Sequence, residues 1–334
     1  MKPLNPTSFL RTEGITLDVR SPSEYAHAHL PKAVNIPLFS DQERAEVGTC
    51  YKQQGAGPAF QLGLRFAGPK LENFFVKARK QLENGALAKI HCWRGGMRSQ
   101  AMAQLFAASG IPSVVLEGGY KAYRHHVLKE LETPLTIRLL GGMTGSGKTL
   151  MLQALRERGE QILDLEALAN HRGSSYGKQS GPQPSTEQFE NLIADQIRSI
   201  DTKRPIWIED ESRLIGCCKI PDPLFHQMKR AKLIVVERPL EERMEILRQQ
   251  YAETDPAELI NSTHNIANRL GSERAGQVTR LIREKGYRKA CELVLSYYDK
   301  SYQHATQQRD GKPLVLFRTG LNTTEWTDAL LATV

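Results

Sequence analysis

One stretch constrains the fold of this chain more than any other. Residues 142–149, with the sequence GMTGSGKT, fit the pattern GxxxxGK[ST] of a phosphate-binding loop. An apolar run at residues 135–140, typical of a buried strand, precedes the loop, and residues 150–155 begin a helix after it. Because strand, loop and helix come in the order that this motif requires, the stretch predicts a P-loop domain with a parallel α/β sheet.

The loop is expected to bind a diphosphate. Its backbone N–H groups would surround the anion, Lys148 would reach the outer oxygens, and Thr149 could hold Mg²⁺. No other metal position is firm, and no tightly bound cofactor is expected. The residues predicted to bind phosphate are Gly142, Thr144, Gly145, Ser146, Gly147, Lys148 and Thr149.

Further along the chain, several charged residues are candidates to support the P-loop. Asp164 ends one predicted strand, where it either supports the site or caps the next helix. Glu209 and Asp210 end another strand, in a Walker B-like pattern that would position a metal ion or a water molecule. Arg172 belongs to a basic loop at 171–178 that either closes over an anion or is simply solvated.

The first part of the chain contains a second distinctive loop, HCWRGGMRS at residues 91–99. An apolar predicted strand at 86–90 precedes the loop, and a predicted helix follows it. At such a turn, backbone N–H groups and the helix N-terminus favour a thiolate at Cys92 and an anion beside it. We therefore predict that Cys92 is a nucleophile and that Arg98 and Arg94 orient an anionic substrate.

The segments around this loop resemble a rhodanese domain. The matching stretches are Asp18-Val19-Arg20, Glu24-Tyr25, His29-Leu30-Pro31, Asn35-Ile36-Pro37, the Cys92 loop and Glu117-Gly118-Gly119-Tyr120. Rhodanese-like domains carry chalcogen atoms as a cysteine persulfide, so the resemblance implies this role for Cys92. Asp18 and Arg20 either brace the site as an ion pair or form a surface pair of little energetic value.

The spacing within the loop departs from the usual sulfurtransferase pattern. Five residues separate Cys92 from Arg98, a longer spacing that looks like that of cysteine phosphatases. The longer loop suits a tetrahedral, phosphate-sized anion better than a bare sulfane sulfur. A cysteine phosphatase fused to a kinase-like domain stays open as an alternative, although no loop with a general-acid aspartate is evident.

Length and charge set the wider expectations. A chain of 334 residues predicts about two domains, which we place at 1–132 and 133–334. The net charge of +8 favours an anionic partner, and residues 1–132 hold 17 Lys and Arg against 11 Asp and Glu. The sequence has no apolar stretch long enough for a bilayer, and its five cysteines are scattered without CxxC spacing. We therefore expect a cytoplasmic protein without a membrane partner.

As a whole, the chain resembles the tRNA 2-selenouridine synthase family. The matching stretches are Val47 to Gly55, Arg94 to Ser99, Glu117 to Ala122, Gly142 to Thr149, Asp164 to Glu166 and His171 to Ser174. The resemblance implies a rhodanese-like parallel α/β domain over 1–132. It also implies a P-loop NTPase-like α/β domain over 133–334, with a helical C-terminal part.

The resemblance also implies the chemistry. Such enzymes geranylate the wobble 2-thiouridine of tRNA with geranyl diphosphate and then replace the S-geranyl group with selenium from selenophosphate. Cys92 would carry the selenium as a selanylcysteine, and the tRNA would present its anticodon loop. The P-loop would recognise the diphosphate leaving group, so it need not hydrolyse ATP. An ATP-dependent tRNA sulfurtransferase that uses a Cys92 persulfide stays open as an alternative.

Overall fold

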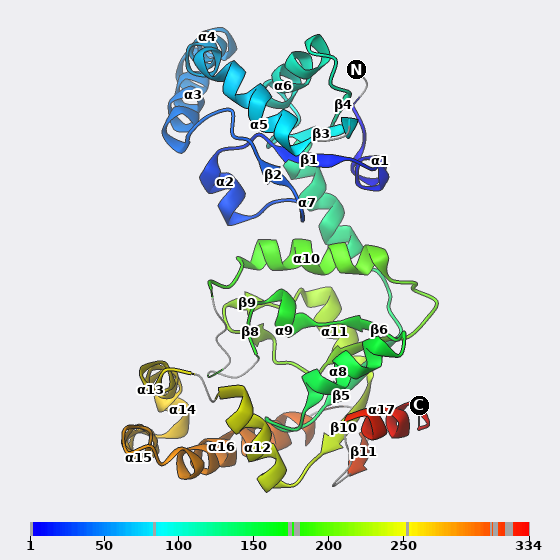
Figure 1. Cartoon of the computed structure of the whole chain (residues 1–334), viewed down its shortest axis with the longest axis vertical. Helices are drawn as coiled ribbons and strands as arrows, with labels where there is room; N and C mark the ends of the chain where they lie inside the picture. Colours follow the sequence, from blue (N-terminus) through cyan, green and yellow to red (C-terminus); the bar gives the residue numbers. More distant parts are fainter. Residues whose placement is uncertain are drawn as a thin grey trace. The chain divides into compact units, whose positions relative to one another are not determined.

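The computed structural model describes residues 3–82, 85–172, 176, 181–251, 254–307, 309, 313–317 and 323–333. The chain forms two compact units, and both are α/β units with parallel sheets, which confirms the predicted fold class (Figure 1). The first unit contains Met1–Leu131 and Glu187–Asp195, and the second contains Glu132–Thr186 and Gln196–Val334. Among the helices of the described residues, none is long and apolar enough to span a membrane.

The first unit is built on a parallel sheet of order β2-β1-β3-β4. Its strands are β1 (Ile15–Asp18), β2 (Val34–Asn35), β3 (Ala88–His91) and β4 (Ser113–Val115). All of β3 is buried, as expected for an inner strand of a parallel sheet. Asp18 pairs in register with His91, so β1 and β3 end at the same edge of the sheet. The segments that follow them, which begin at Val19 and Cys92, therefore leave the sheet side by side.

Helices precede, connect and follow the strands of this sheet along the chain. They are α1 (Pro6–Arg11), α2 (Pro22–His27), α3 (Asp41–Gln54), α4 (Ala56–Ala67), the short 3-10 helix η1 (Gly68–Lys70), α5 (Leu71–Gln81), α6 (Met97–Ala108) and α7 (Gly119–Glu130). The helix predicted after the Cys92 loop is present as α6.

A segment from the second half of the sequence completes the first unit. Residues 187–195 lie within the second domain predicted over 133–334, but they are part of α10 (Thr186–Ser199) and group with the first unit. The Asn191 side chain donates to the His29 carbonyl at 3.0 Å, and the Tyr120 hydroxyl donates to Glu187 at 2.7 Å. These polar contacts explain why residues 187–195 group with the first unit, and no local sequence pattern predicts them.

The second unit is built on a parallel sheet of order β11-β10-β5-β7-β6. Its strands are β5 (Ile137–Gly141), β6 (Gln161–Leu163), β7 (Ile206–Glu209), β10 (Lys232–Glu237) and β11 (Leu314–Phe317), and β8 (Leu214–Ile215) and β9 (Cys218–Lys219) form a separate antiparallel pair. Leu140 of β5 pairs in register with Glu209 of β7. The loop after β5 and the acidic end of β7 therefore lie at one edge of this sheet.

The remaining helices belong to the second unit. They are α8 (Lys148–Glu157), α9 (Leu165–Leu168), α11 (Asp222–Arg230), α12 (Leu240–Tyr251), α13 (Pro256–Asn265), α14 (Ala267–Leu270), α15 (Ser272–Arg283), α16 (Tyr287–Gln307) and α17 (Thr323–Leu331). Helices α13 to α16 share a core of their own that includes Leu270, Val278, Ile282 and Val294. The predicted helical C-terminal part is therefore present.

Candidate functional site

Cys92 directly follows β3 and is almost completely buried, with 3% of its surface exposed. Its Sγ lies 3.3 Å from the hydroxyl oxygen of Ser99, in the first turn of α6. The Ser99 hydroxyl donates to the carbonyl of Gly96 at 3.0 Å, which fixes its position. A fixed hydroxyl group therefore lies beside the sulfur of the predicted nucleophile.

The backbone of the Cys92 loop is held by the start of α7. The N–H of Tyr120 donates to the Cys92 carbonyl at 2.8 Å, and the N–H of Lys121 donates to the Trp93 carbonyl at 2.9 Å. Gly119 has a φ of +61°, and a Cβ added there would lie only 2.4 Å from the Cys92 carbonyl oxygen. The second glycine of the Glu117-Gly118-Gly119-Tyr120 motif is therefore required for this close approach.

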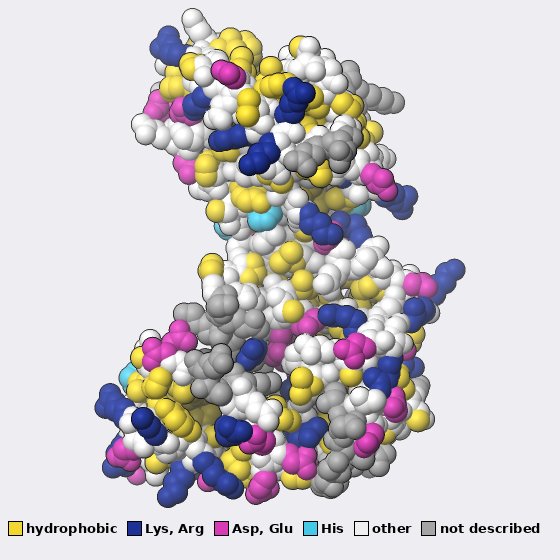
Figure 2. All heavy atoms as spheres, in the orientation of Figure 1, with side chains coloured by type: hydrophobic (Ala, Val, Ile, Leu, Met, Phe, Trp, Pro, Cys, Tyr) yellow, Lys and Arg dark blue, Asp and Glu magenta, His cyan; other side chains and the backbone are white. Residues whose placement is uncertain are grey.

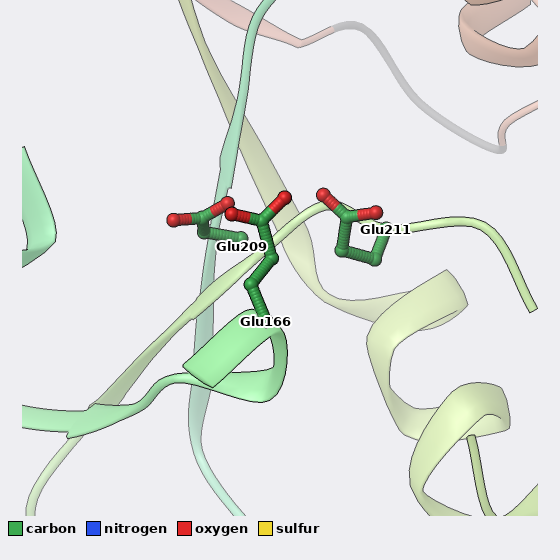
Figure 3. A group of neighbouring side chains, drawn as sticks. All are labelled: Glu166, Glu209 and Glu211. Carbon is green, nitrogen blue, oxygen red and sulfur yellow. The ribbon is translucent and has the colours of Figure 1, made fainter. Parts of the chain in front are cut away.

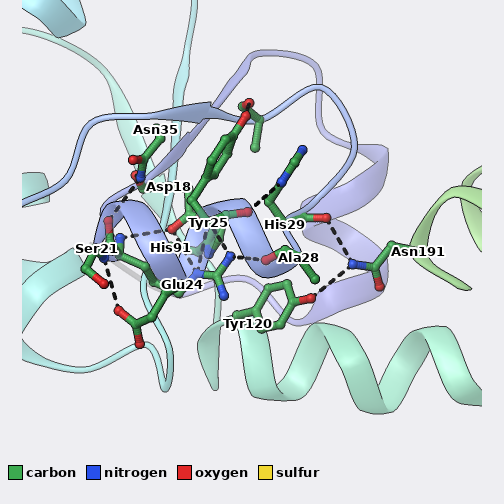
Figure 4. Close-up of polar contacts among 12 residues, drawn as sticks. Asp18, Ser21, Glu24, Tyr25, Ala28, His29, Asn35, His91, Tyr120 and Asn191 are labelled. Carbon is green, nitrogen blue, oxygen red and sulfur yellow. Dashed lines mark hydrogen bonds and ion pairs between the residues drawn. The ribbon is translucent and has the colours of Figure 1, made fainter. Parts of the chain in front are cut away.

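A buried ion pair stands beside the loop. Arg20 Nη2 lies 2.6 Å from Asp18 Oδ2, with both side chains at most 1% exposed, and Nη2 also donates to the Ala28 carbonyl at 2.7 Å. Asp18 and Ala28, the two partners of this guanidinium, are labelled in Figure 4. The guanidinium carbon lies 3.8 Å from the centroid of the Tyr120 ring. Asp18 and Arg20 thus form a buried structural brace that joins the end of β1 to α7, rather than a surface pair.

The two arginines of the loop differ in their surroundings. Arg98 Nη1 donates to Glu24 Oε2 at 2.9 Å, and Arg44 lies 3.5 Å from the other carboxylate oxygen of Glu24. Arg94 is exposed to solvent. Glu24 is not among the site residues predicted from the sequence. An anion that engages Arg98 has to share this guanidinium with Glu24 or displace the carboxylate.

In the second unit, the predicted P-loop has the tight backbone that its glycines permit. Gly142 has a φ of +148° and Gly145 a φ of +79°, and a Cβ at either position would lie within 2.8 Å of a carbonyl oxygen. The Nζ of Lys148, the first residue of α8, donates to the Gly142 carbonyl at 3.0 Å. The loop therefore curls around its own lysine, the arrangement that a diphosphate-binding loop needs.

Three glutamates gather beside the P-loop (Figure 3). Glu166 lies on α9, Glu209 ends β7, and Glu211 follows it in the next loop, with their carboxylate oxygens within 4.8 Å of one another. Thr149 Oγ1 lies 3.4 Å from Glu166 Oε2. Burial, together with the negative charge of neighbouring carboxylates, raises the pKa of each glutamate to about 8.

This acidic cluster fits a divalent cation. Both carboxylate oxygens of Glu209 are buried and have no hydrogen-bond partner among the described residues. Carboxylate and hydroxyl oxygens are the ligands that Mg²⁺ prefers, and Thr149 supplies the hydroxyl. Glu166 and Glu211 thus join Thr149 and Glu209 as candidate ligands, although neither is among the site residues predicted from the sequence. The sequence signal for these two residues was present in the acidic run Glu209-Asp210-Glu211 and in the Asp164-Leu165-Glu166 stretch.

The cluster also sets the charge of the P-loop lysine. Burial alone lowers the pKa of Lys148, but the negative charges of Glu209, Glu211 and Glu166 outweigh it, so the pKa is raised above its usual value. Lys148 therefore stays protonated at neutral pH and can bind an anion.

Two predicted supporting residues have other partners. The Asp164 carboxylate accepts from the N–H of Ala167 at 2.9 Å and so caps α9. Asp210 forms an ion pair with Arg309 rather than joining the three glutamates. Of the two acidic residues predicted to support the P-loop from this strand, Glu209, the last residue of β7, is thus the one that faces the P-loop lysine and Thr149.

Arg172 lies at the surface of the second unit. The basic loop that contains it was predicted either to close over an anion or to be solvated. Most of that loop, at residues 173–175 and 177–178, lies outside the described residues.

Comparisons with known proteins assign both parts of the chain. The family model "tRNA 2-selenouridine synthase AAA domain" matches residues 135–330, and the model "Rhodanese-like domain" matches residues 8–126. The chain is similar to proteins named tRNA 2-selenouridine synthase from Marinobacter nauticus and Hydrogenovibrio crunogenus. The first is 35% identical over 93% of each chain, and the second is 34% identical over 89% of this chain and 90% of the relative.

Proposed function

The chain belongs to the tRNA 2-selenouridine synthase family, and on that premise we propose that it converts wobble 2-thiouridine in tRNA to 2-selenouridine in two transfer steps. Geranyl diphosphate would be the first co-substrate and selenophosphate the second. The observation that carries this proposal is the presence, in one chain, of a cysteine in a glycine-bearing loop and a P-loop beside a buried acidic cluster. Two anionic co-substrates require two anion sites of this kind.

The first step would take place at the P-loop. The carbon–oxygen bond of geranyl diphosphate breaks, a carbon–sulfur bond to the thiouridine forms, and the N3 proton of the base is released. Negative charge grows on the departing diphosphate, where the loop N–H groups and the Lys148 ammonium would bind it. Mg²⁺, when bound, supplies further positive charge there, and Thr149 and Glu209, with Glu166 and Glu211, are the residues that would hold it.

The second step would take place at Cys92. Its thiolate attacks the phosphorus of selenophosphate, the selenium–phosphorus bond breaks, and hydroselenide leaves while the phosphoryl group stays on the sulfur. The hydroselenide then attacks C2 of the geranylated base and expels geranylthiolate, which leaves the selenocarbonyl on the base. Water finally cleaves the sulfur–phosphorus bond, which releases phosphate and frees the Cys92 thiol. Cys92 would thus release the selenium from its donor rather than carry it as a selanylcysteine, because a sulfur–selenium bond would require an oxidant.

The tRNA would be recognised by charge and by stacking. A net charge of +8 favours the phosphate backbone, and an anticodon loop can present an unstacked base. Trp93, next to Cys92, is 37% exposed, and its ring lies 5.6 Å from that of Tyr120. This indole offers an aromatic surface on which a splayed-out base can stack.

Nucleoside mass spectrometry tests the proposal. The full chain is incubated with tRNA that contains 2-thiouridine, a small thiol, and either co-substrate alone or both together. Geranyl diphosphate alone should give S-geranyl-2-thiouridine, and both co-substrates should give 2-selenouridine. Thiolation of unmodified tRNA with thiosulfate and ATP would contradict the proposal in favour of a sulfurtransferase. Rapid hydrolysis of an aryl phosphate would favour a phosphatase.

A further inference from the structure

A cavity of about 580 Å³ opens beside the P-loop, within the second unit. Thr144 of the P-loop belongs to its lining, and the walls come from α12, α13, α15 and α16. Hydrophobic side chains reach the surface in this region, at the lower left of the space-filling view (Figure 2). Most of the inner wall is aliphatic and includes Met244, Leu247, Val278, Ile282, Val294 and Leu295.

Helix α12 connects this cavity to the phosphate-binding loop. Arg243 Nε donates to the Thr144 carbonyl at 2.9 Å, and the same guanidinium forms an ion pair of 2.6 Å with Asp299 of α16. A Cβ added at Gly145 would lie 3.0 Å from Leu247 Cγ, so the P-loop backbone and the cavity wall are in contact. A ligand whose head binds the P-loop can therefore extend directly into the cavity.

The chemistry of the lining identifies the kind of ligand tail. The charged residues of the lining, such as Glu241, Glu245 and Arg248, are exposed or half-buried, whereas the buried residues carry aliphatic side chains. A nucleobase placed against these aliphatic groups would lose hydrogen bonds to water without replacement, which is costly. An unbranched or methyl-branched hydrocarbon loses none and gains from leaving water.

We propose that this cavity binds the hydrocarbon tail of a prenyl diphosphate whose diphosphate is held by the P-loop, and that its inner wall limits the length of that tail. The inference rests on the proposed function, because it names where the geranyl chain of the first co-substrate lies. Cys291 of α16, which lines the cavity and packs against Met244, Leu247 and Leu295, is the residue best placed to test it.

The first experiment uses the Cys291 thiol of the unaltered protein as a reporter. Neither Cys291 nor Cys217 forms a disulfide, but Cys291 is half-buried whereas Cys217 is exposed. The protein is treated with N-ethylmaleimide alone or with geranyl diphosphate, inorganic diphosphate or ATP, and alkylation at each cysteine is followed by peptide mass spectrometry. Geranyl diphosphate should slow alkylation of Cys291 at least about fivefold and leave Cys217 unchanged. Equal protection by ATP would show that the cavity takes a nucleoside, and would overturn the inference.

The second experiment narrows the cavity. Cys291→Trp should shift the donor preference from geranyl towards dimethylallyl diphosphate by about tenfold or more, the scale on which apolar pockets discriminate chain lengths. Cys217→Trp, at the surface, is the matched control and should keep the original preference. An unchanged preference in soluble, folded Cys291→Trp would overturn the inference.

The outcomes separate this inference from the proposed function. Only the cavity assignment fails if the unaltered protein geranylates tRNA, geranyl diphosphate does not protect Cys291 from alkylation, and Cys291→Trp keeps the original donor preference. If it transfers no prenyl group and geranyl diphosphate does not protect Cys291, the proposed function fails. The protection experiment needs no substitution, so a misfolded variant does not remove the test.

Discussion

The guanidinium of Arg98 is held by Glu24, with 2.9 Å between Nη1 and Oε2. Both side chains are largely buried, at 19% and 14% exposure, so solvent screens this ion pair less than a surface pair. The arginine best placed in the sequence to orient an anion therefore already has a carboxylate partner. Under the proposed function, selenophosphate would have to compete with Glu24 for this arginine.

This competition predicts that Glu24→Gln lowers the KM for selenophosphate. Removing the negative charge should strengthen anion binding by up to about tenfold, whereas Arg98→Ala should weaken it by a similar factor. Steady-state kinetics on geranylated tRNA measure both effects. Glu46→Gln, on the exposed face of α3, is the control. If Glu24→Gln instead raises KM as much as Arg98→Ala, Glu24 serves to position Arg98.

Cys92→Ser should abolish selenation while geranylated tRNA accumulates. A serine hydroxyl is a far weaker nucleophile than a thiolate at neutral pH, so hydroselenide should not be released from selenophosphate. Nucleoside mass spectrometry after incubation with both co-substrates measures the two products. Cys50→Ser should behave as the unaltered protein. Loss of both products in Cys92→Ser would contradict the assignment of the two steps to two sites.

Lys148→Ala should show the converse behaviour. Without the ammonium group, charge on the departing diphosphate is less stabilised, and geranylation should fall by about 10² or more. Selenation of tRNA that is already geranylated should remain within about twofold of normal, as it does not need the P-loop. Lys203→Ala, at an exposed position, is the control. A failure of Lys148→Ala to selenate geranylated tRNA would argue against a P-loop that serves geranylation alone.

Two glycine substitutions should separate backbone strain from the close approach at the Cys92 loop. Gly119→Ala places a Cβ 2.3 Å from the Gly95 nitrogen, at a φ of +61°. Gly110→Ala has a similar φ of +74° but no described atom within 4 Å of the new Cβ. We expect a loss of about 1 kcal/mol in the free energy of unfolding for Gly110→Ala and about 3 kcal/mol or more for Gly119→Ala. Urea denaturation measures both, and equal losses would contradict the packing described for Gly119.

The acidic cluster predicts a dependence of stability on pH and Mg²⁺. A folded-state pKa of about 8 for Glu166, Glu209 and Glu211 lies above the usual 4.5, so between these values the folded state holds more protons than the unfolded state. Stability should therefore fall as pH rises through this range. Millimolar Mg²⁺ should restore it, and should raise Tm more at pH 8.5 than at pH 6, where protons compete for the carboxylates.

Thermal unfolding with Mg²⁺ or with a chelator measures this effect. Glu209→Gln should reduce both the pH dependence and the gain from Mg²⁺. Glu245→Gln, at an exposed position on α12, should change neither. A gain from Mg²⁺ that is the same in Glu209→Gln as in the unaltered protein would place the cation elsewhere.

The fold class was predictable because its strongest signals are local. The P-loop pattern fixes a strand, a tight turn and a helix within about twenty residues, and apolar runs mark the other strands. Helix α4 was not anticipated, since Gly57, Pro58 and Gly63 are typical of turns. It forms because Pro58 lies in the first turn, where a proline is tolerated, and because Gly63 lets the helix approach Phe39.

The candidate site was predictable only where a motif lies within one segment. Cys92, Lys148 and Thr149 belong to such motifs. By contrast, Glu211 becomes a candidate ligand only because α9 and the end of β7 meet, and Glu24 only because α2 packs near Arg98. The cavity beside Thr144 is made by helices that each look like an ordinary amphipathic helix in the sequence. These features depend on tertiary packing that periodicity does not specify.

Because residues 187–195 belong to the first unit, the two units cannot be separated by dividing the chain once. The chain passes from one unit to the other at three places, after Leu131, Thr186 and Asp195, so no single cut separates them. A fragment that stops at residue 132 would lose Asn191 and with it the side-chain donor to the His29 carbonyl. An experiment that exchanges the first unit between relatives, or expresses the two units as separate chains, should therefore keep residues 187–195 together with residues 1–131. Without them, the first unit would lack part of its own structure.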